Sequence, residues 1–119
     1  MQSIYPAVRY NDAKAGVAWL KAALGFDARE VYEGEGNTIA HAQLALAGNL
    51  IMLGSGAAGG IYVALGSKAE IDAAYARAKS AGAEILREPV ETDYGSYEFG
   101  VRDPEGHLWS FGTYRPQAT

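Results

Sequence analysis

The chain repeats one pattern of sequence signals twice, and this internal duplication is the strongest constraint on its fold. Leu24-Gly25 is matched by Ala81-Gly82, so the two glycines lie 82 − 25 = 57 residues apart. Gly48-Asn49-Leu50 is matched by Gly106-His107-Leu108, at 106 − 48 = 58 residues. A solenoid needs at least about three repeats, so two copies with this period favour two supersecondary modules around a shared core.

Local signals place one helix and four strands in each copy, which predicts an α+β fold made of two β-α-β-β-β modules. The predicted strands cover residues 4–10, 28–33, 38–46 and 50–53, and then 61–65, 84–87, 97–102 and 108–113. The first helix follows the cap candidates Asn11 and Asp12, and the second starts at a capping box, Ser67-Lys68-Ala69-Glu70. Pro89 is expected to end the strand before it, because proline has no N–H to donate.

The length of 119 residues predicts a single domain, residues 1–119, that can bury roughly two-thirds of its unfolded surface. Within it we expect module one at 1–53, a glycine-rich linker at 54–60 and module two at 61–116. A flexible linker there would let the modules pair within one chain or exchange between two chains.

Composition excludes several classes of protein. Cysteine is absent, which removes disulfides and zinc–thiolate sites and suits a reducing cytoplasm. The formal net charge of −4 argues against nucleic acid as a partner. The uncharged stretch 37–67 is interrupted by glycines and polar residues, so we expect no membrane span, and the N-terminus has no signal-peptide pattern. The predicted location is cytoplasmic.

The turn and strand Asp103-Pro104-Glu105-Gly106-His107-Leu108-Trp109, together with the two β-α-β-β-β modules, resembles the vicinal oxygen chelate superfamily. Glyoxalase I, bleomycin-resistance proteins and extradiol dioxygenases belong to this superfamily. His41-Ala42-Gln43-Leu44 and Leu50-Ile51-Met52-Leu53-Gly54 look like the middle strands of its small members. The resemblance covers Tyr5 to Tyr114 and implies sheets that curl into a cleft, commonly completed by a second subunit, so we expect a homodimer.

Enzymes of this superfamily hold a divalent metal through side chains on the first and last strands of each module. By resemblance and by the 57- and 58-residue offsets, these positions are Tyr5, Met52, Tyr62 and Ser110 here. If the fifth strand is shifted by two residues, Gly60 replaces Tyr62. Phenols, a thioether and an alcohol are poor ligands for ions that prefer imidazole or carboxylate, so we predict no metal and no other cofactor.

Two further residues are candidates for the binding site, each with a structural alternative. Arg9 lies four residues after Tyr5, so alternation puts both on one strand face. In glyoxalase-like relatives an arginine at this spacing contacts an anionic substrate, but Arg9 could equally pair with Glu98 or Asp103. His41 could transfer a proton, although a packed histidine bonded to a neighbouring strand is the favoured interpretation.

Aromatic residues near the C-terminus are expected either in the core or in contact with a ligand. Trp109 and Phe111 are expected to pack against helices as core. Tyr94, Tyr97 and Phe99 could stack on a planar ligand or simply pack between strands.

Three functional hypotheses remain open at this level. The first is a metal-free homodimer that sequesters a small aromatic or anionic molecule, as bleomycin-resistance proteins do. The second is a glyoxalase-like lyase or isomerase, or a dioxygenase-related enzyme, with atypical metal ligands such as His41. The third is a catalytically silent assembly domain. The predicted ligand-binding residues are Tyr5, Arg9, His41, Met52, Tyr62 and Ser110, and no catalytic residue is assigned.

Overall fold

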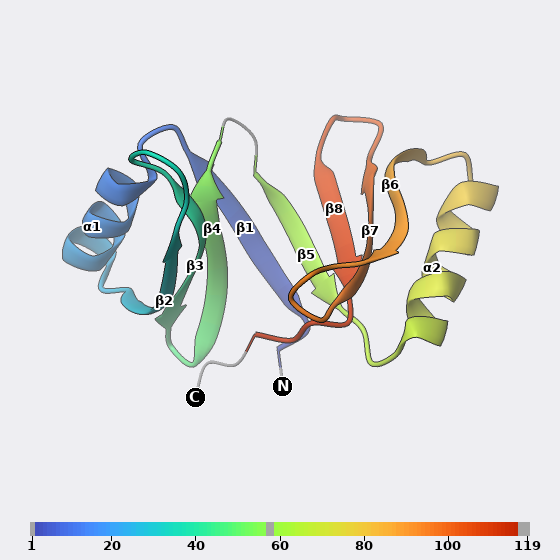
Figure 1. Cartoon of the computed structure of the whole chain (residues 1–119), viewed down its shortest axis with the longest axis horizontal. Coiled ribbons are helices and arrows are strands. Elements are labelled where there is room, and N and C mark those ends of the chain that lie inside the picture. Colours follow the sequence, from blue (N-terminus) through green and yellow to red (C-terminus); the bar gives the residue numbers. More distant parts are fainter. Residues whose placement is uncertain (1, 57–58, 117–119) are drawn as a thin grey trace. The chain divides into compact units, whose positions relative to one another are not determined.

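The computed structural model describes residues 2–56 and 59–116 and contains two compact units (Figure 1). The first unit comprises Ile4–Gly59 with Gln2 and Pro116, and the second comprises Gly60–Arg115 with Ser3. Each unit has the element order β-α-β-β-β, which confirms the predicted fold class. The predicted linker 54–60 includes residues 57 and 58, which lie outside the described residues.

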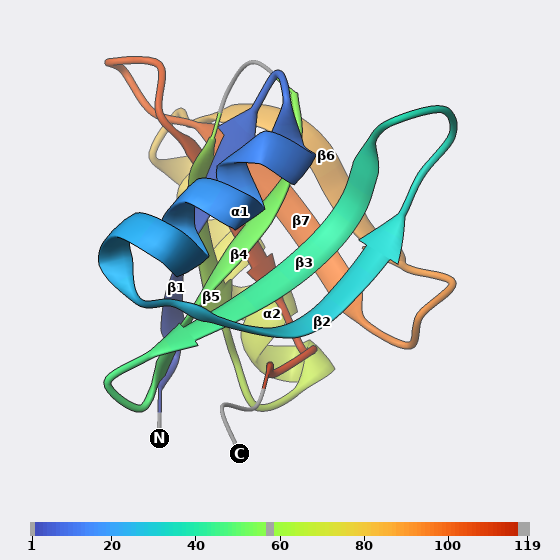
Figure 2. The ribbon, with the colours of Figure 1, turned by 90° about the vertical axis from the view of Figure 1, so that its left-hand side faces the viewer.

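The first unit is a four-stranded sheet with one helix against it. Its elements are β1 (Ile4–Tyr10), α1 (Ala13–Leu24), β2 (Asp27–Glu33), β3 (Ile39–Leu46) and β4 (Asn49–Ser55). The strand order is β2-β3-β4-β1, with antiparallel neighbours except for the parallel pair β1 and β4. α1 crosses one face of this sheet (Figure 2).

The ends of α1 follow the sequence signals. The Asp12 carboxylate accepts a hydrogen bond from the Ala15 backbone N–H at 3.1 Å, which caps the first turn. Gly25 ends the helix in the left-handed conformation, at φ 79°. The helix and sheet then share an apolar core, made of Ala13, Leu20, Ile39, Ala42, Leu44 and Leu53.

The second unit repeats this arrangement. Its elements are β5 (Gly60–Ala64), α2 (Lys68–Ser80), β6 (Glu84–Glu91), β7 (Tyr97–Arg102) and β8 (Leu108–Gly112). The strand order is β5-β8-β7-β6, with β5 and β8 parallel. The core between helix and sheet contains Ile71, Phe99 and Val101, with Trp109 and Phe111 packed against it, as predicted for those two residues. Phe99 stacks on Phe111 at 5.1 Å, so it packs in the core.

α2 begins at Lys68, as predicted, but its capping box is incomplete. Ser67 Oγ accepts a hydrogen bond from the Glu70 backbone N–H at 3.2 Å, which is half of the expected exchange. The Glu70 carboxylate accepts from Gly66 N at 2.7 Å instead of from Ser67 N. The reciprocal bond is therefore displaced by one residue towards the turn.

The prediction that Pro89 ends a strand is wrong. β6 runs through Pro89 to Glu91, and its pairing with β7 shifts register between Arg87 and Val90. Among the described residues β6 pairs only with β7 within its unit, so the proline lies at a bulge of a strand with one partner, where a missing N–H is tolerated.

The two parallel pairs show which residues of the modules are equivalent. Ala7 is opposite Met52 in the first unit, and Tyr62 is opposite Ser110 in the second. Since Met52 and Ser110 are equivalent, Tyr62 corresponds to Ala7, and the counterpart of Tyr5 is Gly60. The 57-residue offset therefore fails for the fifth strand, and the two-residue shift considered above is the correct alternative.

The turn between β7 and β8 is organised by one carboxylate. Asp103 accepts hydrogen bonds from the Trp109 indole N–H at 3.1 Å and from the backbone N–H groups of His107 and Glu105 at 2.9 and 3.0 Å. Gly106 takes φ +90°, which favours glycine. Bonds from Trp109 and His107 lower the pKa of Asp103 to about 2. The most specific segment of the resemblance thus has a structural explanation.

Neither α1 nor α2 is long and apolar enough to cross a membrane, and the described residues contain no other helix.

Gly60→Ala is expected to destabilise the protein, because a methyl group there would collide with the Leu108 carbonyl oxygen and lie 2.9 Å from Leu108 Cβ. Overpacking of this kind lowers the free energy of unfolding by about 1–3 kcal/mol. Urea unfolding measures it. Gly100→Ala is the matched control, because its methyl group would have no neighbour closer than 3.7 Å. Equal unfolding midpoints for the two variants would contradict this account of Gly60.

Asp103 is expected to contribute to stability in a defined pH range. Its folded pKa lies below the unfolded value, so its contribution is complete above about pH 4 and is lost as pH falls from about 4 to about 2. Asp103→Asn should therefore be less stable than wild type at pH 6, with the difference shrinking towards pH 2 in chemical unfolding. Glu105→Gln, in the same turn, should show no such convergence. A constant difference for Asp103→Asn would contradict the assigned pKa.

Candidate functional site

Each sheet has one face covered by its helix and one face without a helix, which we call the helix-free face. In the first unit Val8 and Leu53 point to the helix-covered core. Alternation therefore puts Tyr5, Ala7 and Arg9 of β1 on the helix-free face. Met52 and Gly54 of β4, His41 and Gln43 of β3, and Glu30 and Tyr32 of β2 share it by register.

Four of these residues form a row across the sheet. Arg9 is opposite Gly54, and His41 is opposite Tyr32. The pairing of Ala42 with Leu53 puts His41 next to Gly54. Because glycine has no side chain, the Arg9 guanidinium comes close to Gly54, where a Cβ atom would lie 3.5 Å from Nη1. An imidazole and a phenol follow in the row.

Arg9 is exposed, and its Nη1 donates a hydrogen bond to the Ser55 carbonyl oxygen at 3.1 Å. The carboxylates considered as its partners are bonded inside the second unit. Glu98 pairs with Arg87, and Asp103 with Trp109 and His107.

His41 is hydrogen-bonded on its own strand and stacked across to the next. Its Nε2 lies 3.1 Å from Gln43 Nε2, so with the amide as donor the imidazole nitrogen accepts. The Tyr32 ring lies 6.2 Å from the His41 ring with 20° between the planes. The Tyr32 hydroxyl donates to the Glu30 carboxylate. The result is a polar, partly exposed cluster.

Tyr5 is 1% exposed, and its hydroxyl lies 2.9 Å from the carbonyl oxygens of both Gln2 and Pro116. It therefore acts as a hydrogen-bond donor to the backbone. Met52, on the same face, is half-buried.

In the second unit the helix-free face carries Tyr62 on β5 and Ser110 on β8, which lie opposite each other. The Tyr62 hydroxyl donates to the Tyr114 carbonyl oxygen at 2.5 Å. Burial, and then the negative charge of Glu98, raises the pKa of Tyr62 well above its usual range. Tyr62 is therefore a protonated donor at neutral pH.

The same face holds a buried carboxylate that sequence analysis did not assign to the site. Glu98 is 5% exposed, and its Oε1 accepts from Arg87 Nη2 at 2.8 Å. The Tyr94 hydroxyl lies 3.0 Å from both carboxylate oxygens. Burial, followed by the charge of Glu98 and this hydrogen bond, raises the pKa of Tyr94 to about 12.

The 57-residue period of the sequence places Glu98 at the position equivalent to His41. Met52 pairs with Gln43 on the preceding strand, and its counterpart Ser110 pairs with Gly100. Gln43 therefore corresponds to Gly100. Two residues earlier on each strand, His41 corresponds to Glu98. Their separation, 98 − 41 = 57, is the period read from the glycines. The two units thus place an imidazole and a carboxylate at equivalent positions.

The donors at the superfamily's metal positions do not fit a divalent metal. With the register corrected, these positions are Tyr5, Gly60, Met52 and Ser110. Two polar hydroxyls, one thioether and a missing side chain replace the imidazoles and carboxylates that such ions prefer. No group of three or more His, Cys, Asp or Glu that could hold a metal occurs within residues 2–56 and 59–116.

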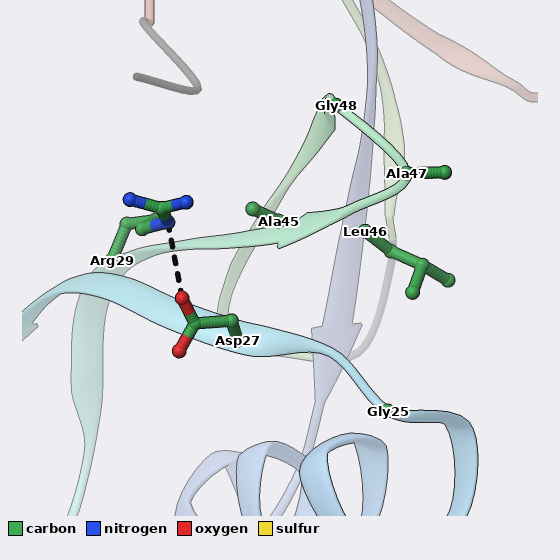
Figure 3. Close-up of a pocket in the computed structure, with 7 residues that line it drawn as sticks. All are labelled: Gly25, Asp27, Arg29, Ala45, Leu46, Ala47 and Gly48. Carbon is green, nitrogen blue, oxygen red and sulfur yellow. Dashed lines mark ion pairs between the residues drawn. The ribbon is translucent and has the colours of Figure 1, made fainter.

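A surface pocket lies elsewhere in the first unit, near the end of α1 and the β3–β4 turn (Figure 3). Arg29 and Asp27, paired at 3.2 Å, form one side of it, and Leu46 and Ala47 lie towards the turn. None of the six predicted binding residues lines this pocket. Their assignment to a binding site stays a prediction.

The comparison with known protein families agrees with this architecture. Residues 4–111 match the Glyoxalase/Bleomycin resistance protein/Dioxygenase superfamily. The chain belongs to this superfamily, as the sequence resemblance predicted. No curated protein sequence matches the chain significantly.

Solved structures show the same fold at low sequence identity. A superfamily member from Vibrio splendidus 12B01 is 21% identical, with a TM-score of 0.73 over 92% of this chain and 96% of that one. Methylmalonyl-CoA epimerase from Streptomyces coelicolor is 18% identical, with a TM-score of 0.71 over 98% and 99%. A 2,2',3-trihydroxybiphenyl 1,2-dioxygenase from Sphingomonas wittichii RW1 is 18% identical, with a TM-score of 0.65 over 92% and 41%. These likenesses establish the fold alone.

Proposed function

We propose that this protein binds and sequesters a small anionic organic molecule without a metal ion. The observation that carries the proposal is the donor set at the superfamily's metal positions, where Tyr5, Met52 and Ser110 stand with Gly60. The Tyr5 hydroxyl is already committed to backbone carbonyls. Gly60 cannot gain a side chain without colliding with Leu108.

Arg9 supports an anionic ligand. Its guanidinium has five N–H donors, and one hydrogen bond to Ser55 uses only part of this capacity. Arg9 forms no ion pair with a carboxylate of the described residues, so its charge is available to an anion. A bidentate contact to a carboxylate would fix the orientation of the ligand.

The neighbours of Arg9 support a planar ligand. Gly54 lets the guanidinium lie close to the sheet, and His41 and Tyr32 follow in the same row. A flat ring could lie with its face or edge against the imidazole and its acidic group towards Arg9. The predicted homodimer and cytoplasmic location belong to this proposal as well.

The enzyme hypothesis remains the second candidate, because named structural neighbours include an epimerase and a dioxygenase. A divalent metal that supports turnover would favour it over sequestration.

Arg9→Gln is expected to weaken the binding of benzoate, a minimal planar anion, measured by calorimetric titration. A charge-assisted hydrogen bond contributes about 1.5–3 kcal/mol, which corresponds to roughly a 10- to 150-fold higher Kd. Wild-type affinity should be the same with and without EDTA.

Arg29→Gln is the matched control, because Arg29 is a paired arginine of the same unit that is placed outside the row. It should leave benzoate binding unchanged. Unchanged affinity in Arg9→Gln would remove Arg9 from the site, and loss of binding with EDTA would contradict the metal-free mechanism.

A further inference from the structure

We propose that Glu98 forms a ligand site in the second unit, where it accepts a hydrogen bond from a neutral hydroxyl group of a small molecule. This assignment rests on the proposed function, in which the helix-free face of the first unit binds a small molecule. It adds a site on the helix-free face of the second unit, with a chemical requirement on the molecule that binds there.

The first reason is the unused acceptor capacity of a buried carboxylate. An ionised carboxylate has about four lone-pair sites. Within the described residues, Glu98 receives one N–H from Arg87 and one O–H from Tyr94. A carboxylate that is 5% exposed has little access to water, and buried acceptors without donors are costly. A further donor would therefore bind favourably.

The second reason is that Tyr94, the residue that donates to Glu98 Oε2, lies at the surface. Among the described residues, the donor to Oε2 is the Tyr94 hydroxyl alone, and Tyr94 is 60% exposed. Its turn is closed by the bond from Gly95 N to the Thr92 carbonyl oxygen. A ligand hydroxyl could replace the Tyr94 hydroxyl at Oε2 while Arg87 keeps its bond to Oε1.

The third reason is that the surrounding sequence accommodates the carboxylate on this face. A methyl group at Gly112 would lie 2.7 Å from Glu98 Cγ and 2.6 Å from the Tyr62 hydroxyl, so glycine allows both side chains to approach. Tyr94 and Tyr114 lie edge to face at 6.1 Å and offer aromatic surface next to the carboxylate.

The charge balance favours a neutral donor over a cation. Arg87 already neutralises Glu98 through a contact of 2.8 Å. An ammonium group would therefore meet a carboxylate whose charge is balanced, together with a nearby guanidinium. A phenolic or alcoholic hydroxyl needs only the lone pair.

The test compares phenol with anisole, which has a similar ring but no donor, by ligand-observed NMR titration of the intact protein. Wild type should bind phenol roughly 2- to 12-fold more tightly than anisole, the range expected for one net hydrogen bond. Glu98→Gln should remove most of this preference. Tyr94→Phe, which keeps the carboxylate and removes its competing donor, should increase it.

Tyr97→Phe is the matched control, because Tyr97 also donates to a carboxylate, Asp72 at 2.7 Å, but on the helix-covered side. It should leave the phenol preference unchanged. Equal affinities for phenol and anisole, or no effect of Tyr94→Phe, would overturn the assignment and leave Glu98 as a structural ion pair. Tighter binding of benzylamine than of phenol would also overturn it. If benzoate binding still depends on Arg9, only this assignment fails; if neither probe binds, the proposed function fails as well.

Discussion

The parallel pairing of the first and last strand in each unit is the constraint on which the rest of the structure depends. In the first unit it sets Ala7 opposite Met52, and in the second it sets Tyr62 opposite Ser110. Because side chains alternate along a strand, this register decides which residues reach the helix-free face and which enter the core. A slip of one residue would exchange Arg9 with Val8 or Tyr10, which pack against α1.

The sequence predicted the architecture well because its landmarks are local. Helix caps at Asp12 and Ser67 and the left-handed Gly25 are determined by a few neighbouring residues, and all three are confirmed. The register of β5 was not predictable from the same period. The caps are 67 − 12 = 55 residues apart, whereas the glycines that end the helices are 57 apart. α2 is one residue longer than α1 and is followed by Ala81. The spacing of the glycines after the helices therefore does not give the register of the strands that precede the helices.

The polar clusters were harder to predict, because they depend on pairs that are distant in sequence. Glu98 alternates with apolar residues, as an exposed strand residue would, and its partner Arg87 lies eleven positions away across an irregular strand pair. Pro89 suggested that β6 ended before this pairing was complete. In the first unit, the assignment of His41 to a binding site stays a prediction, and its stacking on Tyr32 follows from the β2–β3 register, which includes two shifts.

Together these features describe a member of a superfamily known for metal sites, in which the corresponding positions carry two hydroxyl groups, a thioether and a glycine. The most direct measurement is a titration of purified, chelator-treated protein with Zn²⁺, Ni²⁺, Mn²⁺ and Fe²⁺, followed by metal analysis after dialysis. We predict no saturable binding and no metal retained in proportion to protein. Retention of about one equivalent of any of these ions, lost on Tyr5→Phe or His41→Ala substitution, would contradict the account.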